Sequence, residues 1–133
     1  MKRIGIIGAM AQEVSTLVSQ LDNPQRYEHA GFVFHTGTRY GLEVIVLQSG
    51  IGKVNAAVGT AILLERHQPD AIINTGSAGG FAADLAIGDV IISDEVRHHD
   101  VDAVVFGYEI GQVPGMPAAY LADKSLREVA RNA

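Results

Sequence analysis

Gly8-Ala9-Met10-Ala11-Gln12-Glu13 is the stretch that decides the fold, and it directly follows the apolar run Ile4-Gly5-Ile6-Ile7. The apolar run predicts a buried strand over residues 2–7, and the pattern that follows predicts a helix over 12–21. The turn between them therefore lies at the carboxyl end of a strand, where open α/β sheets bind their ligands. Glu13 falls in the first helical turn, where the helix dipole favours an ionised carboxylate that can serve as a general base.

Apolar strands, glycine-bearing turns and helices continue to alternate along the chain. The pattern predicts strands over 32–38, 42–47, 71–74 and 89–93 (the last extending to about His98) and a helix over 53–68. Asp22-Asn23-Pro24 is expected to end the first helix, and residues 100–117 to form a long loop. Asp123 is expected to cap a last helix. Together these elements predict one α/β domain over residues 1–133.

Each long helix is expected to turn an apolar face to the sheet. On the first helix this face comprises Val14, Leu17 and Val18. On the second it comprises Val54, Ala57, Val58, Ala61, Ile62 and Leu64.

Composition excludes several classes of protein. The 133 residues are 47% hydrophobic and carry a formal net charge of −5, without a run of lysines and arginines. Nucleic acid and anionic membranes are therefore not expected as partners. The chain has no cysteine, which removes disulfides and thiolate chemistry. Met1-Lys2-Arg3 is basic, but glycines break the apolar stretch behind it, so we expect a cytoplasmic protein without a signal peptide or membrane span.

Glycine-bearing turns follow three of the predicted strands, at Gly8, Gly50 and Gly76. If these strands lie side by side, the turns line one crevice with backbone N–H groups aimed into it, which suits a small ligand. The first turn lacks the third glycine of a dinucleotide-binding fingerprint, and the chain has no P-loop pattern. The sequence therefore favours a small-molecule site of another kind.

Several spaced motifs resemble one known family. Gly8-Ala9-Met10-x-x-Glu13, Ser49-Gly50-Ile51-Gly52-Lys53-Val54-Asn55-Ala56-Ala57 and Asn74-Thr75-Gly76-Ser77-Ala78-Gly79-Gly80 occur in this order. Gly88-Asp89-Val90, Ser93-Asp94-Glu95, His99-Asp100-x-Asp102 and Phe106-Gly107-Tyr108-Glu109-x-Gly111-Gln112-x-Pro114-Gly115 follow them. The chain resembles the bacterial 5′-methylthioadenosine/S-adenosylhomocysteine nucleosidases of the nucleoside phosphorylase superfamily.

The resemblance implies a fold: a three-layer α/β/α sandwich with a central mixed sheet. It covers only the N-terminal part of the family, so the chain is expected to be truncated at its C-terminus. The missing part of the family would hold the acidic residue that grips the ribose, the aspartate that protonates the purine and the aromatic ring that stacks on it. The 133 residues alone are therefore expected to be inactive.

The activity implied by the resemblance is hydrolysis of the N-glycosidic bond of an adenine thionucleoside. This reaction is a step of methionine salvage. By resemblance, Glu13 polarises the attacking water, and Ser77 positions that water and the ribose. Ala78 and Gly79 present backbone to the nucleoside. Ala9, Met10 and Ile51 form apolar walls near the ribose and the 5′ thioether. Two plainer interpretations stay open: Met10 and Ile51 pack in the core, and Ser77 bonds only its own turn.

The resemblance also implies a homodimer that needs no cofactor. Phe106 and Pro114, in the long loop, would cap the thioalkyl end of the neighbour's pocket, although the loop could equally pack on its own surface. A metal site at His98-His99-Asp100 is not expected, because adjacent residues of a strand point to opposite faces of the sheet.

The same superfamily contains phosphorylases, which hold phosphate with arginines because a planar guanidinium matches the phosphate oxygens. The two positions that correspond to such arginines here fall at Asn74 and in the turn Ala9-Met10-Ala11-Gln12. Both absences favour water as the nucleophile. Two alternatives remain open: a related hydrolase with another nucleoside such as futalosine, and a non-catalytic, dimerising nucleoside-binding fragment.

Overall fold

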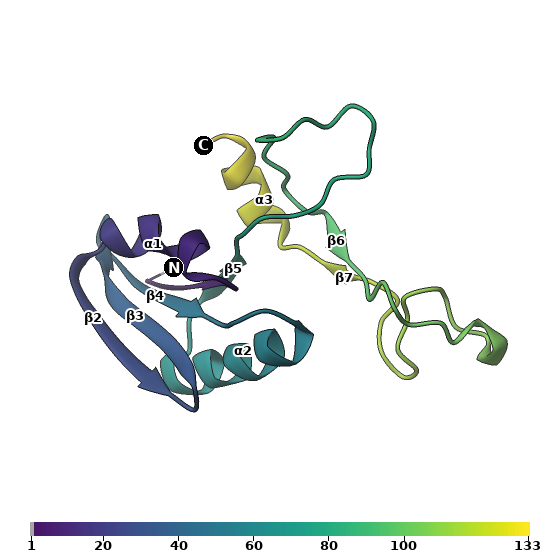
Figure 1. Cartoon of the computed structure of the whole chain (residues 1–133), viewed down its shortest axis with the longest axis horizontal. Coiled ribbons are helices and arrows are strands. Elements are labelled where there is room, and N and C mark those ends of the chain that lie inside the picture. The colour runs from purple at the N-terminus through teal and green to yellow at the C-terminus, as the bar shows by residue number, and fades with distance from the viewer. Residues whose placement is uncertain (1) are drawn as a thin grey trace. The chain divides into compact units, whose positions relative to one another are not determined.

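A computed structural model describes residues 2–133, which form two compact units, one up to Gly80 and one from Phe81 onward. The first unit contains five strands and two helices (Figure 1). In chain order these are β1 (Arg3–Gly8), α1 (Ala11–Ser19), β2 (Asp22–His29), β3 (Phe32–Arg39), β4 (Leu42–Gln48), α2 (Lys53–His67) and β5 (Ala71–Asn74).

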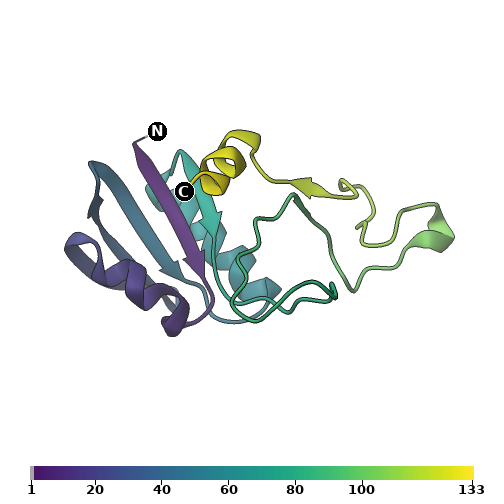
Figure 2. The same cartoon turned by 90° about the horizontal axis from the view of Figure 1, so that it is seen from above.

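The five strands form one mixed sheet in the order β2-β3-β4-β1-β5. β1 runs parallel to both of its neighbours, and Figure 2 shows it lying between β4 and β5. β2, β3 and β4 form an antiparallel meander. The sheet is therefore mixed, as expected, and the carboxyl ends of its three parallel strands meet at one edge.

The two helices cover opposite faces of this sheet, because alternate residues of β4 point to opposite sides. Ile45 and Leu47 pack with Leu63 of α2 in one core cluster. Val44 and Val46 pack with Val14 and Leu21, at and just beyond α1, in a second cluster. The first unit is thus a three-layer α/β/α sandwich, which confirms the predicted fold class.

α1 ends at Ser19, before Asp22-Asn23-Pro24, but the sequence analysis did not predict the strand β2, which begins at Asp22. β2 is an edge strand that pairs only with β3, and most of its residues are exposed. Tyr27 anchors it by stacking on Phe34, with ring centroids 5.1 Å apart. A polar edge strand with a proline lacks the apolar alternation on which the sequence prediction depends.

The predicted apolar face of α2 was also largely wrong. Leu63 and Gly59 are the buried residues of this helix, whereas Val54 is 77% exposed. A Cβ at Gly59 would lie 3.1 Å from side-chain atoms of Leu47 and Phe32, so the glycine lets the helix approach the sheet closely. We call the apolar stripe left in solvent the outer face of α2. It comprises Val54, Ala57, Val58, Ala61 and Leu64.

The second unit holds less regular structure. It contains β6 (Glu95–Val96), the 3₁₀ turn η1 (Val104–Phe106), β7 (Tyr120–Leu121) and α3 (Lys124–Arg131). β6 and β7 form a short antiparallel pair. The Asp123 carboxylate accepts a hydrogen bond of 2.9 Å from the N–H of Leu126, which confirms the predicted cap of the last helix.

No strand forms over residues 89–93, so that prediction was wrong, and only Glu95–Val96 is extended in a sheet. Val90 and Ile91 are exposed, and no neighbouring strand pairs with them among residues 2–133. An apolar alternation becomes a strand only when a partner satisfies its backbone groups.

Candidate active site

Three turns continue from the carboxyl ends of β1, β4 and β5 and remain hydrogen-bonded to one another. The N–H of Ser49 donates to the carbonyl of Gly8 (2.9 Å), and the N–H of Gly50 donates to that of Ala9 (3.0 Å). On the other side, the N–H of Thr75 donates to the carbonyl of Ile7 (2.9 Å). As expected from parallel pairing, the turns line a single cleft of about 330 Å³. Its lining residues are Ala9, Glu13, Ser49, Gly50, Gly52, Lys53, Ala56, Asn74, Thr75, Gly76 and Ser77.

The carboxylate of Glu13 is held in this cleft by four hydrogen bonds. Its Oε2 accepts from the backbone N–H groups of Ala9 (2.9 Å) and Met10 (3.0 Å). Its Oε1 accepts from the N–H (3.0 Å) and the hydroxyl (3.1 Å) of Ser77. Met10 is the N-cap of α1 and Glu13 is at N3, so the carboxylate satisfies N–H groups that the helix leaves unpaired.

These hydrogen bonds hold the pKa of Glu13 below its ordinary value of 4.5. The largest cause is the bond from the Ser77 backbone, followed by the bond from the Met10 backbone. Both bonds stabilise the ionised form. At neutral pH the cleft therefore presents a carboxylate in a fixed orientation.

Two glycines make room for this arrangement. A Cβ on Gly76 would lie 2.8 Å from Oε1 of Glu13, closer than real side-chain contacts allow. A Cβ on Gly8 would lie 2.5 Å from Cγ1 of Val14, so a side chain there would push α1 away from β1. Gly76 thus allows the turn after β5 to approach Glu13 closely, and Gly8 allows α1 to pack closely against β1.

The structure brings some of the predicted site residues together at the cleft. Ala9, Glu13 and Ser77 line it, and Met10 reaches Glu13 through its backbone N–H. The other predicted residues are not among those that line it. Ile51, Ala78 and Gly79 are exposed and absent from the lining, and Phe106 and Pro114 are exposed in the second unit. Core packing of Ile51, the plainer interpretation, is also ruled out, because its side chain is 73% exposed.

Sequence reasoning did not single out Ser49 and Asn55 as site residues. Ser49 is buried, and its hydroxyl donates to the carbonyl of Gly50 (3.0 Å). The amide of Asn55 donates to the carbonyl of Ile51 (2.8 Å), which braces the same turn. A polar residue directly after an apolar strand, and an asparagine in the first turn of the next helix, were the available signals.

The cluster His98-His99-Asp100 does not form a ligand set. The Nδ1 of His99 lies 4.0 Å from the carboxylate of Asp100, and the ring of His98 packs edge-on against Tyr120. Within residues 2–133, no three histidine, cysteine or acidic side chains gather as metal ligands. In the same part of the chain, no helix combines the length and the apolar character needed to span a membrane.

Comparison with known proteins gives a consistent result. Residues 3–133 match the family model described as the phosphorylase superfamily. The 5′-methylthioadenosine/S-adenosylhomocysteine nucleosidase of Chromohalobacter salexigens is 69% identical over 131 residues, which make up 98% of this chain and 56% of that protein.

Two solved structures are also similar. The nucleosidase of the same name from Colwellia psychrerythraea, in complex with adenine, matches with a TM-score of 0.95 and 52% identity over 98% of this chain and 54% of that one. The Neisseria meningitidis nucleosidase, in complex with methylthio-immucillin-A, matches with a TM-score of 0.96 and 43% identity over 99% of this chain and 57% of that one. The chain therefore spans a little over half the length of the relatives it matches.

Proposed function

The chain belongs to the phosphorylase superfamily, and we propose that it carries the water-activating part of an N-glycosyl hydrolase acting on 5′-methylthioadenosine and S-adenosylhomocysteine. The observation that supports this most directly is the Glu13 carboxylate, fixed by four donors in a cleft at the ends of three parallel strands. We further propose that residues 1–133 belong to a single nucleosidase domain.

In the proposed reaction, Glu13 binds a water molecule and accepts its proton. As the water oxygen bonds to the anomeric carbon, the bond from that carbon to the adenine nitrogen breaks, and its electron pair leaves with the base. The sugar passes through a state with oxocarbenium character, as in glycoside hydrolysis. Among the described residues that line the cleft, Glu13 is the one carboxyl group, so the acid that protonates adenine comes from outside this set.

Ser77 has two proposed roles. In the structure its hydroxyl donates to Glu13 Oε1 (3.1 Å). Rotation of the hydroxyl toward a bound ribose frees Oε1 for the water, while the backbone bond from Ser77 keeps the carboxylate in place. Ala9, Met10 and Ile51 are proposed as apolar contacts to the ribose and thioether, and the backbones of Ala78 and Gly79 as contacts to the nucleoside.

Water is preferred over phosphate as the nucleophile because of the composition of the cleft. Asn74 and Thr75 precede the glycine of the turn after β5, and no arginine is among the described residues that line the cleft. Arginine is the side chain whose planar guanidinium matches two phosphate oxygens at once. The proposed enzyme is therefore a hydrolase rather than a phosphorylase.

We also propose that the protein is a cytoplasmic homodimer acting in methionine salvage. The outer face of α2 supports self-association, because its apolar residues recur at helical spacing and are exposed. A two-fold axis through such a stripe buries it against its own copy. In this dimer Phe106 and Pro114 cap the thioalkyl end of the neighbouring pocket.

The test is adenine release from 5′-methylthioadenosine in phosphate-free buffer, using the product of the complete gene. Glu13→Gln removes the base but keeps the size of the side chain, and it should lower turnover by roughly two to four orders of magnitude while nucleoside binding persists. Glu28→Gln, the same substitution at an exposed ion pair with Arg26, is the matched control.

Each outcome of this test distinguishes between the proposed function and one of its alternatives. Unchanged turnover in Glu13→Gln would remove Glu13 from the mechanism. Faster release of hypoxanthine from futalosine than of adenine would assign a different nucleoside. Nucleoside binding without any release by the wild-type protein would favour the non-catalytic alternative.

A further inference from the structure

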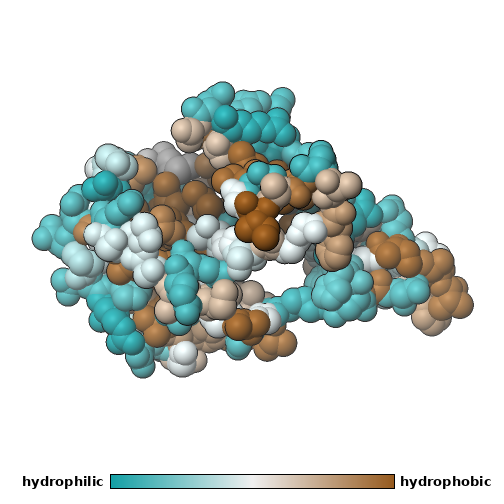
Figure 3. Space-filling model, turned by 45° about the horizontal axis from the view of Figure 1, so that its top comes forward, coloured by the Kyte–Doolittle hydropathy of each residue, from teal (hydrophilic) through white to brown (hydrophobic). Residues whose placement is uncertain are grey.

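The segment between β6 and β7 exposes many apolar side chains although it has little regular structure. Apart from η1 it consists of turns and irregular backbone. Figure 3 shows hydrophobic surface at the far right of the view, over the segment that follows β6 in Figure 1. The exposed apolar residues include Val104, Val105, Phe106, Ile110 and Met116. A loop of this length keeps one conformation only when specific contacts tie it down.

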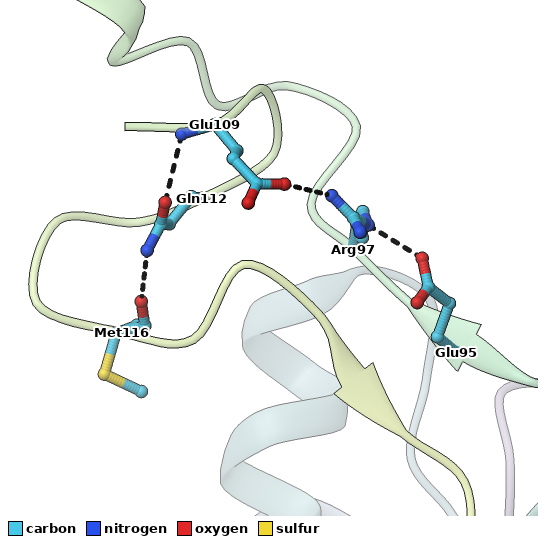
Figure 4. Close-up of polar contacts among 5 residues, drawn as sticks. All are labelled: Glu95, Arg97, Glu109, Gln112 and Met116. Carbon is cyan, nitrogen blue, oxygen red and sulfur yellow. Dashed lines mark hydrogen bonds and ion pairs between the residues drawn. The ribbon is translucent and has the colours of Figure 1, made fainter. Parts of the chain in front are cut away.

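Arg97, directly after β6, provides such a contact. Its Nε donates to Oε1 of Glu95 (2.8 Å), and its NH1 donates to Oε2 of Glu109 (3.0 Å). Figure 4 shows the guanidinium lying between the two carboxylates, one on the strand and one in the loop. The arginine thereby joins the middle of the loop to the β6–β7 pair.

Two further contacts extend this connection along the loop. The side chain of Gln112 accepts from the N–H of Glu109 (3.0 Å) and donates to the carbonyl of Met116 (2.9 Å) (Figure 4). The N–H of Gly111 donates to the carbonyl of Val101 (2.9 Å). Gly111 has a φ of +81°, and a Cβ there would lie 2.7 Å from the carbonyl oxygen of His98. The backbone therefore passes very close to the end of β6.

Arg97, Glu95 and Glu109 are all exposed, and exposed ion pairs contribute little to the stability of a fold. Their geometric effect is larger, because the planar guanidinium fixes the direction of each bond. We expect that breaking the contact with Glu109 leaves the fold intact but loosens the part of the loop between Phe106 and Pro114. These are the two residues that the proposed function places at the neighbour's pocket.

We propose that Arg97 is a positioning residue, which holds the loop through Glu109 in the conformation that presents Phe106 and Pro114 to the thioalkyl group of the substrate. This inference rests on the proposed function. Arg97 itself touches no substrate in this scheme, and its effect passes through the loop. Loss of Arg97 should therefore weaken the binding of substrates that carry a thioalkyl group and leave the binding of substrates that lack one unchanged.

The first experiment measures amide hydrogen exchange over residues 104–116 in the wild-type protein and in Arg97→Ala. Exchange should become faster in this segment and stay unchanged in β1 and β4. Arg26→Ala, which breaks an exposed ion pair with Glu28 in the first unit, is the matched control and should leave the loop unaffected. Equal protection of the loop in Arg97→Ala would overturn the proposal.

The second experiment compares kinetics on 5′-methylthioadenosine and on 5′-deoxyadenosine, which ends at the 5′ carbon. Arg97→Ala should raise KM for the thioether substrate about two- to fivefold, the range expected for one exposed ion pair, with kcat nearly unchanged. KM for 5′-deoxyadenosine should stay constant. Equal effects on both substrates, or none on either, would refute the positioning role.

A double variant separates Arg97 from its partner. If Arg97 acts through Glu109, then Arg97→Ala combined with Glu109→Ala should be no worse than either single variant. Additive effects would contradict the proposal. If the wild-type protein releases no adenine, the proposed function fails. Hydrogen exchange then still decides whether Arg97 orders the loop.

Discussion

Replacing Gly76 with alanine should displace the carboxylate of Glu13 without unfolding the protein. The new Cβ would lie 2.8 Å from Oε1 and 2.9 Å from Cδ of Glu13, whereas ordinary van der Waals contact begins at 3.4 Å. Relief of the closer contact requires a shift of about 0.6 Å, and a misplacement of about 1 Å can lower a catalytic rate by about a hundredfold. We therefore expect kcat for adenine release to fall roughly tenfold or more.

The assay is steady-state hydrolysis of 5′-methylthioadenosine by the product of the complete gene, with thermal unfolding measured in parallel. Gly31→Ala is the control. Gly31 lies in the β2–β3 turn with a φ of +82° and no atom within 4 Å of its would-be Cβ, so alanine there costs stability without touching the cleft. Turnover within twofold of wild type in a folded Gly76→Ala protein would refute the argument that the position of this carboxylate limits the rate.

Three further predictions address other parts of the chain. In the proposed mechanism Glu13 is the ionised base, and its pKa is held below 4.5, so the acid limb of kcat/KM should lie below that pH. Ser77→Ala, which removes one hydrogen bond to the ionised form, should move the limb to higher pH in a pH–rate profile. Val58→Lys, on the outer face of α2, should abolish the proposed dimer in analytical ultracentrifugation; a variant that still dimerises would exclude this face. Leu63→Ala should lower the free energy of unfolding by about 2–5 kcal/mol in urea titration, because Leu63 is fully buried; a loss under 1 kcal/mol would contradict the assigned core.

The order of strands and helices in the first unit was largely predictable, because β1, β4 and β5 are apolar runs bounded by turns and β3 alternates apolar and polar residues. The edge strand β2 was not, because its pairing depends on β3 and on one aromatic contact from Tyr27. The orientation of α2 on the sheet could not be predicted from the sequence either. Helical periodicity shows that an apolar stripe exists but not which of two stripes meets the sheet, and here Gly59 decides this by allowing close approach.

The centre of the candidate site was easier to predict from the sequence than its periphery. Parallel strands end at one edge of a sheet, so the turns that carry Glu13 and Ser77 were expected to meet. The contribution of Met10 through its backbone, and the exposure of Ile51, depend on the exact path of each turn. Spacing in the sequence does not determine such paths, because one glycine with a positive φ, such as Gly50 or Gly52, redirects every residue after it.

The position of β1 in the middle of the sheet has a consequence for biosynthesis. Ile4 pairs with Val44 and with Ala71, so β1 leaves the ribosome before either of its two partner strands. At an elongation rate of about 5–20 residues per second, Ala71 is made roughly 3–13 s after Ile4. Until Ala71 is made, at least one edge of the apolar strand β1 lacks its partner strand. Slower translation between β1 and β5 lengthens this exposure, and exposed apolar strands on incomplete chains favour aggregation.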